Sequence, residues 1–152
     1  MVSLFAISLY ITIRFDKKYA LYALFALFHD LFIVFGIFSW LGILFSIEVN
    51  SLFAVSLLTI AGYSVNDTVV IFDRIRENLR SSKEGYNEII QLSVNESFRR
   101  TTFTSITTLI PLLTLILFGS YSLFWFSLSL SLGIIVGSYS SILLAPSFLL
   151  KD

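Results

Sequence analysis

Long apolar segments separated by short charged ones are the feature that most constrains how this chain can fold. The segment from Tyr19 to Phe45 contains one aspartate and one histidine as its only ionisable groups besides tyrosine, and the segment from Tyr121 to Leu144 contains no charged residue. Inside a bilayer no water can satisfy the backbone, so a spanning segment must close its hydrogen bonds within itself, as an α-helix does. The pattern therefore predicts transmembrane helices.

Composition supports the same interpretation. Hydrophobic residues make up 57% of the chain and charged residues 13%, against roughly 45–50% and about 25% in soluble domains. The 152 residues leave room for five or six spans of about 20 residues each and for no sizeable aqueous domain. The formal net charge of zero gives no case for binding nucleic acid. The absence of cysteine excludes disulfides, thiolate metal sites and a cysteine nucleophile.

We expect an all-α fold, a polytopic membrane helix bundle with five transmembrane helices in a single transmembrane domain over residues 1–152. The predicted spans are residues 1–13, 19–45, 51–72, 101–118 and 121–144. The first span would be about 20 Å long as a helix, which is short of the roughly 30 Å hydrocarbon core. We therefore expect this span to lack its first turns and the chain to begin partway through a larger protein.

Residues 73–100 carry eleven charges in 28 positions and are expected to form a connector outside the membrane. Ser81 and Glu84 have the spacing of a capping box, and Asn87 is a possible N-cap. We expect a short amphipathic helix at the membrane interface; the alternative is a solvated connector.

Five crossings would place all ten Lys and Arg residues on one side of the membrane, which the positive-inside rule makes cytoplasmic. The amino terminus is then expected outside and the carboxyl terminus inside.

Apart from hydroxyl-bearing residues, the polar side chains inside the predicted spans are His29, Asp30, Asn66 and Asp67, and Arg100 directly precedes the next span. Asp67 lies six residues from Asp73, roughly 9 Å inside the charged edge, and a carboxylate at such depth by default marks an ion or proton pathway. Burial favours the protonated acid and a nearby guanidinium favours the ionised one, so Asp67 and Arg100 are predicted to form a proton relay.

The alternatives for these residues are structural. Asp67 would then make a helix–helix hydrogen bond or a fixed ion pair with Arg100, and Arg100 would simply extend to the membrane surface. Asp30 and His29 would satisfy neighbouring backbone or hydroxyl groups.

Two further patterns mark helix faces. Polar residues recur at steps of three and four in the third span, and this stripe should face other helices or water. Its positions are Ser56, Thr59, Tyr63, Asn66, Val70 and Asp73, with Asp67 beside them. Tyr63, Asn66 and Thr68, with Asp30 and His29, are predicted to support a polar path. In the last span Ser129, Gly133, Gly137, Ser141 and Ala145 repeat every four residues, a ridge that lets a neighbouring helix pack closely.

Two other classes of protein are alternatives. Two intramembrane aspartates, Asp30 and Asp67, could share a proton as in an aspartyl protease, but intramembrane proteases of that kind carry Gly-x-Gly-Asp, and here Ser64, Val65 and Asn66 precede Asp67. A purely structural assembly subunit would explain the small-residue ridge and leave the polar stripe unexplained. No metal site or cofactor is expected, since a single histidine offers little for zinc.

The segment from Gly62 to Asn78, GYSVNDTVVIFDRIREN, closely resembles the pattern of the SecF family of the Sec protein-export machinery. The segments Leu27–Asp30, Asn95–Leu109 and Gly133–Ser141 extend the resemblance over nearly the whole chain. The family is grouped with SecD and with transporters of the RND superfamily. Its members typically also have a first span and an external domain, which are absent from this sequence.

The resemblance implies a function in protein transport. A SecF-like subunit would couple the proton gradient to export of preproteins together with SecD, the SecYEG channel and SecA, which would carry out any ATP hydrolysis, so the chain itself is not expected to be an enzyme. Asp67 falls on the family's intramembrane acid and Arg100 on its basic partner. The membrane would be a cell inner (plasma) membrane or a plastid membrane. An RND-type proton-coupled small-molecule transporter component is the alternative.

Overall fold

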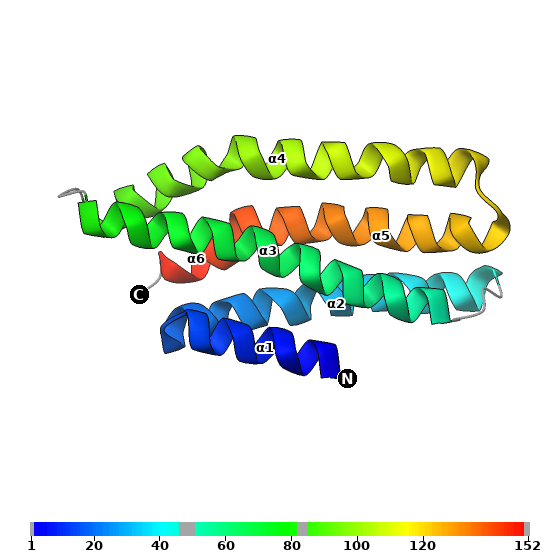
Figure 1. The fold of residues 1–152 in the computed structure, drawn as a ribbon, viewed down its shortest axis with the longest axis horizontal. Coiled ribbons are helices and arrows are strands. Elements are labelled where there is room, and N and C mark those ends of the chain that lie inside the picture. Colours follow the sequence, from blue (N-terminus) through cyan, green and yellow to red (C-terminus); the bar gives the residue numbers. More distant parts are fainter. Residues whose placement is uncertain (1, 46–50, 82–84, 151–152) are drawn as a thin grey trace.

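The computed structural model describes residues 2–45, 51–81 and 85–150, and all the regular structure in them is helical. The predicted all-α fold is confirmed. In chain order the helices are α1 (Val2–Arg14), α2 (Lys17–Phe45), α3 (Ser51–Ser81), α4 (Tyr86–Phe118) and α5 (Tyr121–Tyr139), followed by a π-helical turn (Ser140–Leu144) and α6 (Ala145–Leu149) (Figure 1).

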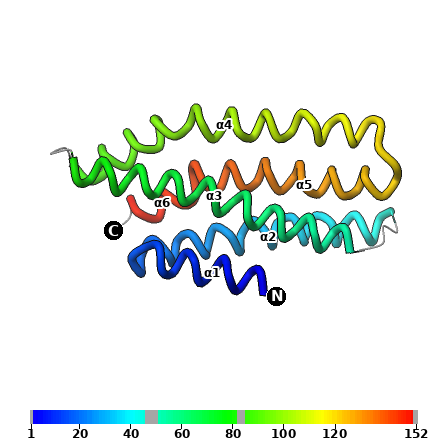
Figure 2. The backbone as a smooth tube through the Cα atoms, viewed as in Figure 1, coloured from blue at the N-terminus to red at the C-terminus, as the bar shows by residue number. Residues whose placement is uncertain are grey.

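The helices form an antiparallel bundle in which α1, α3 and α5 run one way and α2 and α4 the other (Figures 1 and 2). Helix α3 contacts α1, α2, α4 and α5, so it is the central element. Four helical stretches are long and apolar enough to cross a membrane: α2, α3, α4, and α5 continued to Leu149. Helix α1, with 13 residues, is a shorter apolar helix. The chain is therefore a multi-pass helical membrane bundle.

The charged residues of separate helices meet at one end of the bundle, which we call the charged end. Arg14 Nη2 lies 2.6 Å from Asp73 Oδ2, which ties α1 to α3. Arg74 Nε lies 2.7 Å from Glu96 Oε2, which ties α3 to α4. The predicted topology with five crossings requires that these charged segments lie together at one end of the bundle. Lys151 lies outside the described residues, and the side of the membrane on which the charged end lies stays a prediction.

Residues 73–100 differ from the expected connector. Helix α3 continues to Ser81 and α4 begins at Tyr86, so most of this segment forms the outer parts of two long helices, and the described residues contain no separate interfacial helix. The hairpin of α3 and α4 extends beyond the other helices at the charged end (left in Figure 1). Its inner faces stay buried at Ile75, Asn78 and Ile89, and this packing keeps both segments helical beyond the predicted spans.

The predicted caps of this segment also differ. Gly85 stands at the N-cap of α4, and its backbone N–H donates to Glu88 Oε2 at 3.3 Å, so Asn87 lies in the first turn and is not the cap. Ser81 ends α3 and its hydroxyl donates to the carbonyl of Glu77 at 3.2 Å. Ser81 therefore does not open a helix, and its predicted partner Glu84 lies outside the described residues.

Two apolar clusters form the core. The one nearer the charged end joins α1, α2, α3, α4 and α6; in it Phe72 is fully buried with its ring edge-on to Phe15 and Tyr19, at centroid distances of 6.0 and 5.4 Å. The other cluster joins α2, α3, α4 and α5 toward the opposite end, and its buried members are Val34, Phe38, Phe53, Ile60, Leu112, Leu130 and Ile134.

The small residues of the last span face the central helix. A Cβ atom added at Gly133 would overlap side-chain atoms of Ile60 on α3, and one added at Gly137 would lie 3.3 Å from the Cβ of Ser64. Helix α5 therefore approaches α3 more closely than a larger side chain at Gly133 would allow.

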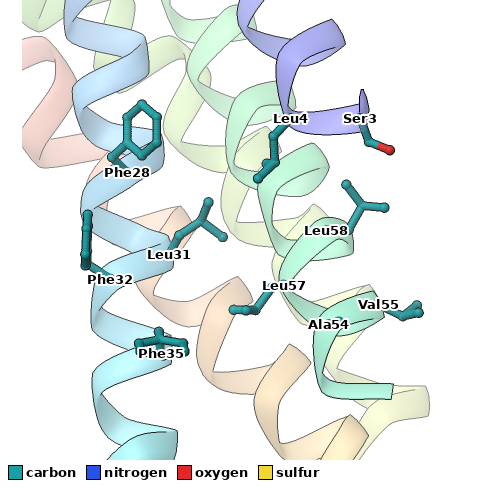
Figure 3. Close-up of a pocket in the computed structure, with 10 residues that line it drawn as sticks. All are labelled: Ser3, Leu4, Phe28, Leu31, Phe32, Phe35, Ala54, Val55, Leu57 and Leu58. Carbon is teal, nitrogen blue, oxygen red and sulfur yellow. The ribbon is translucent and has the colours of Figure 1, made fainter. Parts of the chain in front are cut away.

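An apolar pocket of about 520 Å³ lies between the first turns of α1, the middle of α2 and the start of α3. Figure 3 shows Leu31 of α2 and Leu57 of α3 pointing into the same space, with Phe28, Phe32 and Phe35 along α2. None of the ionisable residues singled out in the sequence lines it. The pocket is therefore separate from the polar residues described next.

Candidate functional site

Asp67 is buried in the middle of the bundle, with 4% of its surface exposed. Its Oδ2 atom is buried and has no hydrogen-bond partner among the described residues. A buried polar atom without a partner is costly, and native structures hold few of them. The described surroundings of Asp67 therefore offer its Oδ2 atom no hydrogen bond that would stabilise a negative charge.

Arg100 lies on α4, near enough for its positive charge to act on Asp67. The guanidinium is exposed, and no ion pair within 4 Å joins Arg100 to Asp67 in the part of the chain that the structure describes. The fixed ion pair considered from the sequence is thus not formed. The two residues are therefore neighbours without a direct ion pair.

A charged groove of about 410 Å³ lies between the outer parts of α3 and α4, and Arg100 is one of the residues that line it. It is lined by residues of the outer parts of α3 and α4, namely Val70, Asp73, Arg74, Glu77, Glu96, Ser97 and Arg100. Val70 is three residues along α3 from Asp67, less than one helical turn. The groove therefore reaches from the charged end almost to the buried acid.

Tyr63 lies one turn from Asp67 on the side away from the charged end. Its hydroxyl donates to Ser105 Oγ at 3.1 Å, and Ser105 Oγ lies 2.6 Å from Ser138 Oγ. These three hydroxyls join α3, α4 and α5. The sequence singled out Tyr63, whereas Ser138 follows no residue pattern that would mark it as a partner of the tyrosine.

Asp30 is fully buried on α2 and, unlike Asp67, has several partners. Its Oδ2 atom accepts hydrogen bonds from the hydroxyls of Ser64 and Ser140, each at 2.6 Å. His29 Nδ1 lies 3.0 Å from the other oxygen, Oδ1. The carboxylate thus connects α2 to α3 and to the π-helical turn, which agrees with the structural alternative considered for Asp30 and His29.

The π-helical turn explains how two consecutive serines both point inward. Ser140 and Ser141 are each fully buried, although neighbours on a regular α-helix point about 100° apart. Here the N–H of Ala145 donates to the carbonyl of Ser140, a five-residue step, and Pro146, next along, has no N–H to donate. The widened turn lets Ser140 reach Asp30 while Ser141 lies 2.9 Å from Thr68 Oγ1. π-Turns of this kind often occur at functional sites.

This turn also changes the predicted end of the last span. The sequence predicts an end at residue 144, just before Ala145 and Pro146. The helix instead continues through Pro146 to Leu149 as α6, because the π-turn accommodates the proline without ending the helix.

The predicted polar stripe of α3 is divided between two environments. Ser56 and the adjoining Asp67 are buried, whereas Thr59 and Asn66 are exposed. Asn66 lines a shallow groove beside α1, with Ala6, Ile7 and Tyr10 among its other members. The structure therefore does not bring Asn66 together with Asp67, because α4 and α5 cover one side of the stripe and leave the other uncovered.

The two aspartates face different partners. Asp30 is bonded to Ser64, Ser140 and His29, and no hydrogen bond between the two carboxylates occurs in residues 2–45, 51–81 and 85–150. A catalytic pair of aspartates shares a proton at close range. The arrangement disfavours the aspartyl protease, as the missing Gly-x-Gly-Asp motif did.

Fold and site together define a multi-pass helical membrane protein with ionisable side chains inside the bundle, a class in which such groups mark ion and proton pathways. The family model described as "Protein export membrane protein SecD/SecF, C-terminal" matches residues 1–151. The chain belongs to this SecD/SecF family, and its relatives place it on the SecF side.

Two relatives carry the name "Protein translocase subunit SecF". The one from Prochlorococcus marinus is 57% identical over 150 residues, which cover 98% of this chain and 47% of the relative. The one from Synechocystis is 47% identical over 148 residues, with coverage of 97% and 47%. The chain thus spans about half the length of the curated relatives it matches.

Solved structures agree with this placement. The chain superposes on SecDF from Thermus thermophilus, titled a translocon-associated membrane protein, with a TM-score of 0.88 and 39% identity over 95% of this chain and 20% of that one. SecDF in a super-membrane-facing form gives a TM-score of 0.81 and 40% identity, with the same coverage.

Proposed function

We propose that this chain is the membrane part of a SecF-type subunit of the Sec translocase and that it couples the proton gradient to export of preproteins. The family and the names of the relatives support the role in protein export. The observation that carries the proton role is the buried Asp67 Oδ2 without a hydrogen-bond partner in the described chain.

Asp67 would take up and release the proton, and Arg100 would control when it does so. Burial favours the neutral acid, whereas an approaching guanidinium favours the carboxylate. Because Arg100 is exposed at a groove that ends within one turn of Asp67, its side chain can alternate between water and the acid. Each approach would release a proton toward the charged end, and each withdrawal would allow the acid to be protonated again.

The proposed partners follow from the relatives. SecD would pair with this chain, as the solved SecDF structures suggest, and SecYEG, SecA and the preprotein would complete the machinery, with any ATP hydrolysis assigned to SecA. Thr68 and Tyr63, with their hydroxyl partners, would support the path. We place the charged end on the cytoplasmic side of the inner membrane, so that the amino terminus lies outside.

The test is Asp67→Asn in the full-length subunit, assembled with its SecD partner in vesicles that carry a proton gradient. The amide keeps the size of the side chain and cannot release a proton, so we expect loss of the stimulation of export by the gradient. Asp16→Asn is the matched control, since Asp16 is an exposed carboxylate at the charged end that does not line the groove beside Arg100.

Retention of full stimulation in Asp67→Asn would end the proton role. If the variant lowers assembly with SecD as much as it lowers export, Asp67 is structural and the chain acts as an assembly subunit. Gradient-driven uptake of a small solute, without any effect of Asp67→Asn on export, would favour the RND-type transporter.

A further inference from the structure

Two arginines at the charged end, Arg14 and Arg76, share a single carboxylate, and we call them the arginine pair. Arg14 Nη2 lies 2.6 Å from Asp73 Oδ2, and Arg76 Nη1 lies 3.9 Å from Asp73 Oδ1. Both guanidinium groups lie over the ring of Phe15, with their central carbons 5.5 and 5.7 Å from its centroid. No second carboxylate lies within 4 Å of either guanidinium in the part of the chain that the structure describes. One positive charge of the pair is therefore not neutralised.

The turn between α1 and α2 does not supply the missing negative charge. It carries Asp16, but Lys17 and Lys18 follow, and all three side chains are exposed. Residues 16–18 therefore add one further formal positive charge beside the arginine pair. An anion with several oxygens can bind two guanidinium groups at once, and phosphate is the anion whose geometry arginine matches in this way.

A groove between α1 and α3 begins one helical turn from the arginine pair. Its first part has a volume of about 370 Å³, and its lining includes Tyr10 of α1 and Val69 of α3. Tyr10 is four residues from Arg14, and Val69 is four residues from Asp73, which is about one turn on each helix. Gly62 also lines this part, and a Cβ atom added there would meet no atom within 4 Å. The absence of a side chain at Gly62 therefore keeps the groove open.

The groove continues along the same two helices, away from the charged end. Its second part is the apolar pocket of about 520 Å³, in which Ser3 and Leu4 of the first turn of α1 lie beside Leu58 of α3 (Figure 3). From Val69 to Val55, which lines this second part, the two hollows extend about 21 Å along α3 at 1.5 Å per residue. One leaflet contributes roughly 15 Å to the hydrocarbon core. The groove is therefore long enough to hold an acyl chain of a lipid.

The polarity of the lining falls with distance from the arginine pair. The first part contains the hydroxyl of Tyr10 and the exposed amide of Asn66, whereas the second part is apolar apart from Ser3. A glycerophospholipid has its own groups in the same order, namely a charged phosphate, ester carbonyls and hydrocarbon. An amide in an apolar environment is costly unless it is hydrogen-bonded, and an ester carbonyl would accept a hydrogen bond from Asn66.

We propose that an anionic phospholipid binds between α1 and α3, with its phosphate at Arg14 and Arg76 and one acyl chain in the groove. The net negative charge of the lipid offsets the positive charge that Asp73 leaves unneutralised. Basic pockets between membrane helices bind anionic headgroups by this attraction. The site is independent of the proposed proton role, since Asp67 does not line either part of the groove.

The first experiment tests the headgroup. The full-length subunit with its SecD partner, in mild detergent, is titrated with phosphatidylglycerol or with phosphatidylcholine of the same acyl chains, and bound lipid is measured by native mass spectrometry. Arg76→Gln leaves the ion pair of Arg14 and Asp73 in place and should bind phosphatidylglycerol about tenfold more weakly, because one charge-assisted hydrogen bond is lost.

Arg80→Gln is the matched control for this titration. It removes the same charge one turn further along α3 and should leave the affinity for phosphatidylglycerol unchanged. Equal weakening in Arg76→Gln and Arg80→Gln would show unspecific attraction and overturn the site. Equal affinity of the unaltered protein for the two lipids would overturn it as well.

The second experiment identifies what occupies the groove. The photoreactive amino acid p-benzoylphenylalanine replaces Tyr10, which is 52% exposed, in the same complex in vesicles of phosphatidylcholine with a minor fraction of phosphatidylglycerol. We expect lipid adducts on the α1 peptide that are enriched in phosphatidylglycerol. The same replacement at Ile13, which is exposed and does not line the groove, should give adducts in the proportions of the vesicle. A cross-link from position 10 to SecD or to another segment of the subunit would overturn the proposal, because protein would then fill the groove.

A larger side chain at Gly62 tests the groove itself. Gly62→Leu should remove the enrichment of phosphatidylglycerol at position 10, since the new side chain enters the space of the acyl chain. Gly36→Leu is the matched control, because Gly36 is exposed on α2, has no atom near an added Cβ and lines neither part of the groove. Unchanged enrichment in Gly62→Leu would place the acyl chain elsewhere and refute the proposed site.

Discussion

Gly133→Ala tests the close approach of α5 to the central helix. The structure leaves no room for a methyl group at Gly133, since an added Cβ would overlap the Cδ1 and Cγ1 atoms of Ile60 and lie 2.8 Å from its Cγ2. Ile60 is 1% exposed and belongs to the apolar cluster. Its three side-chain atoms cannot all turn away, so the helices have to separate or the core has to repack.

The size of the effect follows from two opposing terms. Overpacking a dense core costs about 1–3 kcal/mol, whereas replacing glycine by alanine inside a helix gains up to about 1 kcal/mol. Gly36→Ala isolates the second term, because an added Cβ there meets no atom within 4 Å. We therefore expect Gly133→Ala to be about 1–3 kcal/mol less stable than Gly36→Ala.

The assay is reversible unfolding of the full-length subunit from mild detergent into sodium dodecyl sulfate, followed by circular dichroism. The double variant Gly133→Ala with Ile60→Ala removes the overlapping atoms. It should therefore be more stable than the sum of the two single effects predicts, by about 1–2 kcal/mol of coupling. Equal stability of Gly133→Ala and Gly36→Ala, or strict additivity in the double variant, would refute the close packing of α5 on α3 at this point.

Two further predictions concern Asp30 and the charged end. Asp30→Ala leaves the hydroxyls of Ser64 and Ser140 without their acceptor, so it should lower the free energy of unfolding in the same assay by about 2–4 kcal/mol. Asp30→Asn keeps one side-chain oxygen and should lower it by less. Equal losses of stability in the two variants would contradict this prediction. At the charged end, in the predicted connector, hydrogen bonds from Arg74 and Asn78 lower the pKa of Glu96. The ion pair between Arg74 and Glu96 should therefore be present above the ordinary glutamate pKa and be lost only as the pH falls through the lowered pKa of Glu96. Arg74→Ala should raise the midpoint of the Glu96 titration, measured by NMR of the carboxyl carbon. An unchanged midpoint would show that Arg74 does not lower the pKa of Glu96.

Much of the fold could be predicted because membrane helices depend on local properties. Length, apolar content and the grouping of charges define the spans of α2, α3, α4 and α5 without any knowledge of their neighbours. The helix ends near the charged end could not be predicted in this way. Asn78 of α3 donates to Ser93 and Glu96 of α4, and such contacts depend on a residue of another helix that no local pattern identifies.

The candidate site likewise has one part that the sequence predicts and another that depends on contacts between helices. The sequence by itself determined that Asp67 and Asp30 lie within long apolar helical segments, because the surrounding residues are apolar whatever the tertiary structure. Only the tertiary structure decided that Asp30 is held by Ser64 and Ser140 while Asp67 Oδ2 has no partner in the described chain. The physical reason is geometric: hydrogen bonds act over about 3 Å. A π-turn at residues 140–144 and the packing of α2 and α5 against α3 set those distances, and no local pattern encodes that packing.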